Sequence, residues 1–155
     1  MIEAGSIAPD FVLNTDTGDE FRLSDHRGRF VVLFFYPEDG TAGCTIEALE
    51  FSALGNDFAA HGAVLLGISP DPVVTHAKFR DAHGLSVTLG ADSELAVTKA
   101  YGLWGAKKMF GVTYDGVIRT TIIVGPGGKV AGVIKASRIK GHAETVLKAV
   151  VGLKG

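Results

Sequence analysis

The sequence predicts a mixed α/β fold, in which a central sheet is covered by helices on both faces. Apolar runs that are typical of buried strands alternate with amphipathic helical segments, and the last two expected strands form a hairpin. The run over residues 30–36 is aromatic and β-branched, and is long enough for a strand buried on both faces. No linker or internal repeat divides the chain, so we expect a single domain over residues 1–155.

Turn residues separate the elements in the first part of the chain. A polar stretch between two short apolar segments predicts an N-terminal β-hairpin over residues 11–23. Pro37 ends the buried strand, because proline cannot donate to a ladder. A loop containing glycine follows, and apolar spacings of three and four predict a helix from about residue 44 to residue 60.

The second part of the chain continues the alternation. Asp71 as N-cap and Pro72 at the first helical position predict the start of a helix after a buried strand at 63–69. We expect an irregular loop over 102–115 and then an unbroken apolar strand over 117–124. The other expected elements are a brief strand at 87–89, a short helix at 94–101, a strand at 129–134 and a helix at 141–153.

Composition argues against several classes of protein. The net charge of −2 gives no strong field for nucleic acid or an anionic membrane, and no apolar run reaches the roughly 18 residues of a membrane span. The N-terminus lacks the features of a secretory signal, and one cysteine cannot form an internal disulfide, which together predict a cytoplasmic protein. The five histidines show no ligand spacing, so we expect no metal site.

Cys44, the only cysteine, falls in the first turn of the helix that follows the buried strand. The first N–H groups of a helix lack internal partners and carry partial positive charge, which favours a thiolate, the reactive form of cysteine. Thr41 precedes it by three residues and could place a hydroxyl beside the sulfur or a substrate oxygen. A lone cysteine can equally be a small buried hydrophobe without chemistry, and the residues alone leave both interpretations open.

Arg119 lies in a row of apolar residues in the expected strand at 117–124. Burying an arginine there is costly unless an anion meets it, and the alternative is an edge position from which the guanidinium reaches water. Glu47, one helical turn after Cys44, could orient Arg119. It could also simply be a first-turn carboxylate that the helix dipole favours, and the two roles are compatible.

The expected loop near residue 105 combines Trp104, Lys107, Lys108 and Met109. So few basic and aromatic residues in a charge-balanced chain are weak support for a nucleic-acid patch. A tryptophan that caps the core and two solvated lysines are the simpler interpretation.

The segment Pro37-Glu-Asp-Gly-Thr41-Ala-Gly-Cys44 resembles the Pro-x-x-x-Thr-x-x-Cys signature of peroxiredoxins. The flanking residues, and the later blocks at 101–111 and 116–123, resemble the bacterioferritin-comigratory-protein subfamily of that family. The resemblance extends from about Gly5 to Leu147 and implies a thioredoxin-like fold. It also implies a thiol-dependent peroxidase that needs no cofactor, because the sulfur itself is the redox centre.

The resemblance assigns a role to each residue of the motif. The Cys44 thiolate would attack a hydroperoxide and become a sulfenic acid. Thr41 would hold the peroxide, Pro37 would shield the sulfur from water, and Arg119 with the backbone N–H groups around Gly43 would stabilise the developing charge. In this family the loop with Trp104 and Met109 lies near the mouth of the active site, which implies contact with a substrate or partner.

Two positions depart from the subfamily pattern. Ala42 stands where many relatives have proline, and Leu49 stands where many have a resolving cysteine, five residues after the reactive one. With no second cysteine, the sulfenic acid must meet an external thiol: glutathione, glutaredoxin, thioredoxin or Cys44 of a second subunit. The subfamily is commonly monomeric, so we expect a monomer. A peroxide sensor with little turnover is the alternative function.

Overall fold

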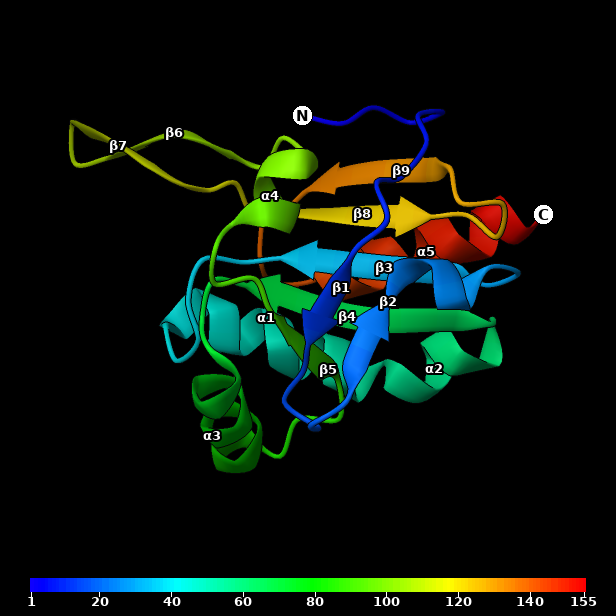
Figure 1. Ribbon diagram of the computed structural model, residues 1–155, viewed down its shortest axis with the longest axis horizontal. Coiled ribbons are helices and arrows are strands. Elements are labelled where there is room, and N and C mark those ends of the chain that lie inside the picture. The colour runs from blue at the N-terminus through cyan, green and yellow to red at the C-terminus, as the bar shows by residue number, and fades with distance from the viewer.

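The structure is a computed structural model that describes all residues from 1 to 155. Its centre is a five-stranded sheet with strand order β5-β4-β3-β8-β9 (Figure 1). The first three strands in that order are parallel, and the last two pair antiparallel, so the predicted mixed sheet is confirmed. The strands are β3 (Phe30–Phe35), β4 (Ala63–Ser69), β5 (Thr88–Ala91), β8 (Thr120–Val124) and β9 (Val130–Lys135).

Strand β3 divides the core into two layers. Val32 and Phe34 point into one apolar cluster, and Val31, Leu33 and Phe35 point into the other. All five side chains are buried, as expected of a strand covered on both faces.

Three helices cover the face to which Phe34 points: α1 (Ala42–Ala53), α2 (Gly55–Ala60) and α5 (His142–Lys154) (Figure 1). Phe34 stacks on Phe51 of α1 with 4.3 Å between ring centroids. The single helix predicted to residue 60 is divided at Leu54, which caps the end of α1 and the start of α2.

The other face is covered by the N-terminal hairpin and a short helix. The hairpin joins β1 (Val12–Asn14) to β2 (Glu20–Arg22), and is followed by the 3₁₀ helix η1 (Leu23–His26). Helix α4 (Ala96–Ala100) packs beside it through the buried Val97. Helix α3 (Val73–His83) lies beside the outer strand β5 (Figure 1). Both faces therefore carry helices, and none of the helices is long and apolar enough to cross a membrane.

The prediction of an irregular loop over 102–115 is wrong. Strands β6 (Trp104–Met109) and β7 (Val112–Val117) form an antiparallel hairpin that extends away from the body of the protein (Figure 1). Phe110 and Gly111 form its turn, with φ of 52° and 77°. Positive φ at both central residues is the pattern of a type I′ turn, which sequence normally signals with Asn-Gly rather than Phe-Gly.

Two further boundaries differ from the prediction. The expected strand at 117–124 is interrupted, because β7 ends at Val117 and β8 begins at Thr120. Helix α3 is capped by Pro72 rather than by Asp71. The Asp71 carboxylate accepts hydrogen bonds from the Ser69 hydroxyl and the Asp39 N–H instead.

Candidate functional site

Cys44 is the third residue of α1, and its side chain is only 1% exposed. Its position in the first turn of a helix is as predicted. The first N–H of this helix with a partner inside the protein is that of Thr45, which donates to the Thr41 carbonyl at 2.9 Å. The N–H groups of Ala42, Gly43 and Cys44 have no such partner, so three free donors lie at the positive end of α1, in the turn that contains Cys44.

Arg119 bridges the sulfur and a buried carboxylate. Its Nη2 donates to Cys44 Sγ at 3.1 Å, and its Nη1 donates to Glu47 Oε1 at 2.7 Å. Burial disfavours the charged guanidinium, but the adjacent Cys44 and Glu47 outweigh this and raise the pKa of Arg119 above its ordinary value. The sulfur therefore lies in contact with a positive charge that is held in place by a buried carboxylate.

The spacing along β8 explains how Arg119 reaches the sulfur, and the break between β7 and β8 explains why Val117 does not share its side. Thr121 and Ile123 of β8 face the layer that contains α1, since they pair with Phe34 and Val32 of β3. Arg119 precedes Thr121 by two residues and turns to the same side. Val117, expected in the same row, belongs to the opposite apolar cluster.

The carboxyl of Glu47 is buried, which makes its ionised form unfavourable. Burial raises its pKa from the ordinary 4.5 to about 7, although the charge of Arg119 acts in the opposite direction. Its Oε2 has no hydrogen-bond partner, and His142 Nε2 lies 3.8 Å from that atom. His142 instead shares a 2.7 Å hydrogen bond with Thr121, and burial, followed by the charge of Arg119, lowers the pKa of this imidazole. The carboxyl of Glu47 therefore changes charge near neutral pH.

Gly43 is required by the space around it. A Cβ built on Gly43 would lie 2.7 Å from Ile139 Cδ1 and 3.5 Å from Arg119 Nη2. The Ile139 side chain thus packs directly against the start of α1, and any larger residue at position 43 would have to displace its terminal methyl group.

Thr41 and Pro37 belong to the loop that leads to Cys44. Thr41 is exposed at the N-cap of α1, and its hydroxyl donates to the Glu38 carbonyl at 3.1 Å. Because this hydroxyl is exposed and its oxygen lone pairs are unused, it can accept a hydrogen bond from a ligand that enters from solvent. Pro37 is half-buried directly after β3.

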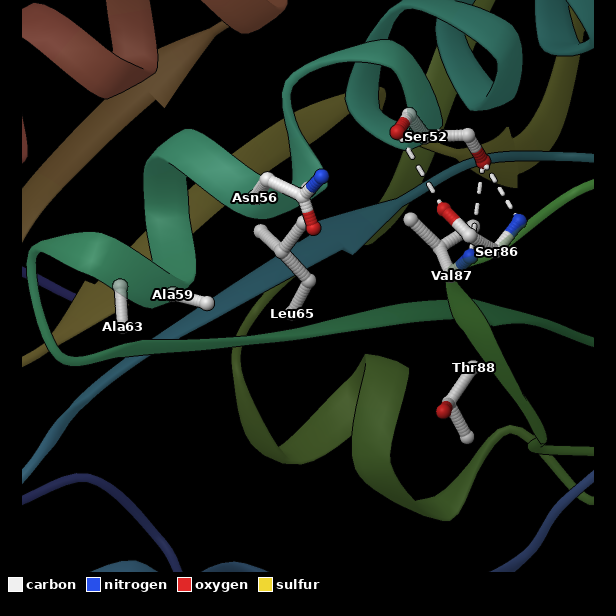
Figure 2. Close-up of a pocket in the computed structure, with 9 residues that line it drawn as sticks. Ser52, Asn56, Ala59, Ala63, Leu65, Ser86, Val87 and Thr88 are labelled. Atoms are coloured by element: carbon white, nitrogen blue, oxygen red, sulfur yellow. Dashed lines mark hydrogen bonds between the residues drawn. The ribbon is translucent and has the colours of Figure 1, made fainter.

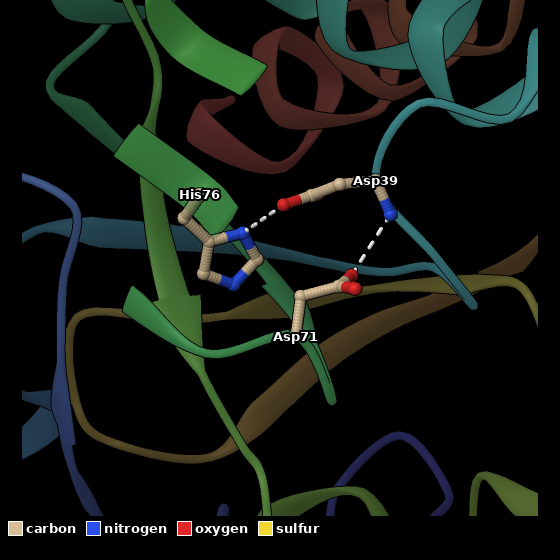
Figure 3. Close-up of side chains that lie close together, drawn as sticks. All are labelled: Asp39, Asp71 and His76. Carbon is tan, nitrogen blue, oxygen red and sulfur yellow. Dashed lines mark hydrogen bonds and ion pairs between the residues drawn. The ribbon is translucent and has the colours of Figure 1, made fainter. Parts of the chain in front are cut away.

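A buried hydrogen-bond cluster that sequence reasoning did not identify holds this loop (Figure 3). Asp39 accepts hydrogen bonds from the Tyr36 hydroxyl and from His76 Nδ1, each at 2.6 Å. His76 Nε2 lies 3.0 Å from the Gly90 carbonyl, and the Asp39 N–H donates to Asp71 at 2.8 Å. His76 and Asp71 lie 37 and 32 residues from Asp39, so the tertiary fold, and no local spacing, brings them to this loop.

Asp39, Asp71 and His76 also lie close enough to one another to hold a cation. However, the atoms that face one another are already engaged in hydrogen bonds, with Asp39 using both carboxylate oxygens and His76 both ring nitrogens. The cluster is therefore explained as an anchor for the loop.

Trp104 and Met109 lie at opposite ends of strand β6. Trp104 is half-buried at the base of the β6–β7 hairpin. It packs against the apolar cluster on the face of the central sheet that the N-terminal β1–β2 hairpin covers. Met109 is 55% exposed near the tip.

Two cavities differ in chemistry. One, of about 400 Å³, lies between α2 and strands β4 and β5, and Ser52 bonds the backbone N–H groups of Ser86 and Val87 there (Figure 2). No charged side chain, histidine or cysteine lines it. The other, of about 430 Å³, includes Arg119 in its lining. The second cavity therefore shares Arg119 with the site around the thiol.

Comparison with known proteins places these features in a family. The AhpC/TSA family model matches residues 4–133. The chain is 38% identical to peroxiredoxin Bcp of Bacillus subtilis over 147 residues, covering 95% of this chain and 94% of the relative.

Solved structures give the same result. The bacterioferritin comigratory protein of Xanthomonas campestris, described with alkyl peroxide reduction activity, superposes with a TM-score of 0.91 at 32% identity, covering 99% of this chain and all of the other. Peroxidoxin BcpB of Mycobacterium tuberculosis superposes with a TM-score of 0.87 at 33% identity, with both chains covered completely. The thioredoxin-like fold expected from the motif is thus confirmed.

Proposed function

The chain belongs to the AhpC/TSA family, as a peroxiredoxin of the bacterioferritin-comigratory-protein type, and from this premise we propose that Cys44 is the residue through which it reduces hydroperoxides. It is a thiol-dependent peroxidase. The single observation that supports the assignment to Cys44 is the 3.1 Å contact between its sulfur and Arg119 Nη2.

In the first step the Cys44 thiolate attacks one oxygen of the hydroperoxide. An S–O bond forms as the O–O bond breaks, the leaving oxygen takes a proton to become water or an alcohol, and the sulfur becomes a sulfenic acid. Arg119 already touches the sulfur, so its guanidinium can follow the negative charge from sulfur to oxygen. The free N–H groups of Gly43 and Cys44 add donors at the same place.

The neighbouring residues have supporting roles in this proposal. Thr41 offers its hydroxyl to the peroxide, and Pro37 limits the access of water to the sulfur. Glu47 acts as a positioning residue that holds Arg119 through the 2.7 Å hydrogen bond. Trp104 and Met109 contact a substrate or partner at the mouth of the site.

The second step needs a thiol from outside the chain, because the sequence has one cysteine. Leu49, at the position of a resolving cysteine in many relatives, has no chemistry to offer. Thioredoxin, glutaredoxin or glutathione would form a mixed disulfide with Cys44, and a second thiol would release it. We further propose one domain over residues 1–155, acting as a monomer on hydrogen peroxide and organic hydroperoxides, without metal, nucleic acid or membrane. A single free cysteine suits the reducing cytoplasm, where we place the protein.

The decisive experiment is a peroxidase assay of the wild type and Cys44→Ser with several thiol donors. We expect turnover with at least one donor for the wild type and none above background for the variant. Mass spectrometry after one equivalent of peroxide should find a sulfenate or mixed disulfide on Cys44. An unmodified Cys44 would contradict the proposal, and a protein that is oxidised once and then stalls with every donor would be a sensor.

A further inference from the structure

The cavity beside Arg119 is positively charged. Its lining residues, which we call the cationic cleft, are Ala106, Lys107, Lys108, Ile118, Arg119, Lys135 and Ala136. Four of these seven residues carry positive charge and none carries negative charge, in a chain whose acidic residues outnumber its basic ones by 17 to 15. This concentration of one sign of charge is a local feature that the overall composition does not predict.

The fold places these charges around Arg119. Lys135 of β9 pairs with Thr120, and the N–H of Ala136 donates to the Arg119 carbonyl at 3.0 Å. The hairpin supplies the other wall, where Lys107 Nζ donates to the Val117 carbonyl at 2.8 Å. Arg119, whose guanidinium contacts Cys44 Sγ, is therefore also one of the residues that line the cleft.

Little negative charge compensates the lysines of the cleft. Lys107, Lys108 and Lys135 form no ion pair, whereas Arg119 is paired with Glu47. Burial, followed by the charge of Arg119, lowers the pKa of Lys107. A neighbouring hollow shares Lys135 and adds Arg138 and Lys140, which extends the positive surface toward α5. An anion in the cleft would relieve this repulsion.

We propose that the cationic cleft binds the anionic group of a low-molecular-weight thiol, and that this thiol is the reductant of oxidised Cys44. The proposal rests on the function proposed above, in which every turnover consumes external thiols. It adds the chemical class of the reductant: a small molecule with a carboxylate or phosphate at a short distance from its sulfur.

The charge change at Cys44 favours a reductant over a peroxide as the occupant. In the proposed cycle, oxidation converts the Cys44 thiolate into a neutral sulfenic acid, so Arg119 no longer faces a negative charge at the sulfur. The cleft therefore becomes more attractive to anions just when the reductant must bind. An anionic hydroperoxide would instead have to bind while the thiolate still carries its charge.

The chemistry balances without any further reagent. The sulfur of the anionic thiol attacks the Cys44 sulfenic acid, an S–S bond forms, the S–O bond breaks, and the hydroxide leaves as water after taking a proton. A second molecule of the thiol then attacks the sulfur of the bound small thiol in the mixed disulfide. The S–S bond to Cys44 breaks, which releases the Cys44 thiolate and a symmetrical disulfide of the small thiol. The two thiols supply the two electrons.

The kinetic test compares two double variants with equal changes in net charge. Lys108→Gln/Lys135→Gln removes exposed lysines of the cleft, whereas Lys78→Gln/Lys99→Gln removes exposed lysines on α3 and α4. Each protein is oxidised with one equivalent of peroxide, and its reduction by 3-mercaptopropionate, 2-mercaptoethanol or cysteamine is followed by quenching and mass spectrometry.

We expect the cleft variant to lose about three- to tenfold in rate with anionic 3-mercaptopropionate, little with neutral 2-mercaptoethanol, and to gain with cationic cysteamine. The control variant should match the wild type with all three thiols. Equal losses with all thiols, or the same loss in the control, would overturn the proposal. So would a cleft variant that slows only oxidation by a hydroperoxide bearing a carboxylate.

A binding measurement separates this proposal from the proposed function. NMR titration of Cys44→Ser with succinate, which has no thiol, should show binding that weakens when Lys108→Gln/Lys135→Gln is added. If Cys44 proved unreactive toward peroxide, the peroxidase assignment would fail, but the succinate titration would still decide whether the cleft binds anions. No saturable shift at the cleft residues would overturn the site itself.

Discussion

The two segments that flank Arg119 are built in opposite ways. The stretch from Tyr36 to Cys44 leaves a fully buried strand and is held by buried hydrogen bonds to Asp39. The β6–β7 hairpin extends from the body and leaves Phe110 98% exposed at its tip (Figure 1). The first segment leads into the helix that carries Cys44, whereas the second contributes Lys107 and Lys108 to the cationic cleft. In our proposals, the buried segment therefore carries out the reaction and the exposed hairpin receives the molecules that take part in it.

The largest effect should come from the residue that joins the two segments. Arg119→Ala removes the donor to Cys44 Sγ and leaves Glu47 buried without its partner. We expect kcat/KM for hydrogen peroxide to fall by roughly 10²–10³, the cost of removing a donor aimed at developing charge. Competition kinetics against a second peroxidase measures this. Arg119→Lys is the control that keeps the positive charge but loses the two-pronged guanidinium, which contacts Cys44 and Glu47 at once. If Arg119→Ala were as active as the wild type, Arg119 would have no part in the mechanism.

The anchor of the rigid segment provides the second test. His76 is completely buried, and Asp39 is 2% exposed in its side chain, so His76→Gln leaves a buried carboxylate short of a donor. We expect the free energy of unfolding in urea to fall by about 3 kcal/mol. The double variant Asp39→Asn/His76→Gln should recover part of this loss. A loss below about 1 kcal/mol would show that the cluster does not hold the loop.

The pH dependence of stability tests the buried carboxyl of Glu47. Its pKa in the folded protein is about 7 against an ordinary 4.5, so between these values the folded state binds the proton more tightly than the unfolded state does. The stabilisation is complete below about pH 4.5 and is lost as the pH rises to about 7. Relative to Glu47→Gln, which cannot titrate, the wild type should lose on the order of 2 kcal/mol across that window. Urea unfolding at several pH values measures it, and parallel curves would contradict the buried carboxyl.

Close packing at the start of α1 predicts a smaller cost. Gly43→Ala places a methyl group 2.7 Å from Ile139 Cδ1, so the Ile139 side chain must shift. We expect a loss of about 1–2 kcal/mol in stability together with slower reaction of Cys44. Ile139→Val in the same chain should restore part of both, because it removes the methyl group that the new side chain meets. The absence of any rescue would assign the loss to another cause.

Sequence patterns predicted the rigid segment better than the hairpin, for a physical reason. The apolar run at 30–36 and the glycine-rich approach to Cys44 are local signals, and the structure places β3 and α1 there. The side chains of the β6–β7 hairpin are almost all exposed along Lys107–Tyr114. The sequence there therefore lacks the alternation of apolar and polar residues that identifies a half-buried strand. The anchor of Asp39 and His76 spans 37 residues, a distance at which local spacing carries no information.

The turn of the hairpin should show the smallest effect. Phe110 adopts a φ of 52°, which costs an ordinary L-residue but suits asparagine, and its ring is almost fully exposed. Phe110→Asn creates the Asn-Gly pair of a type I′ turn, and we expect a gain of about 0.5 kcal/mol in stability with unchanged peroxide kinetics. Gly111→Ala is the matched control: with a φ of 77° and no neighbour within 4 Å of a new Cβ, it should lose about 1 kcal/mol through backbone strain alone. Thermal unfolding of both variants measures the two effects. A destabilised Phe110→Asn would contradict the prediction, because it would show that the Phe110 ring contributes packing energy despite its exposure.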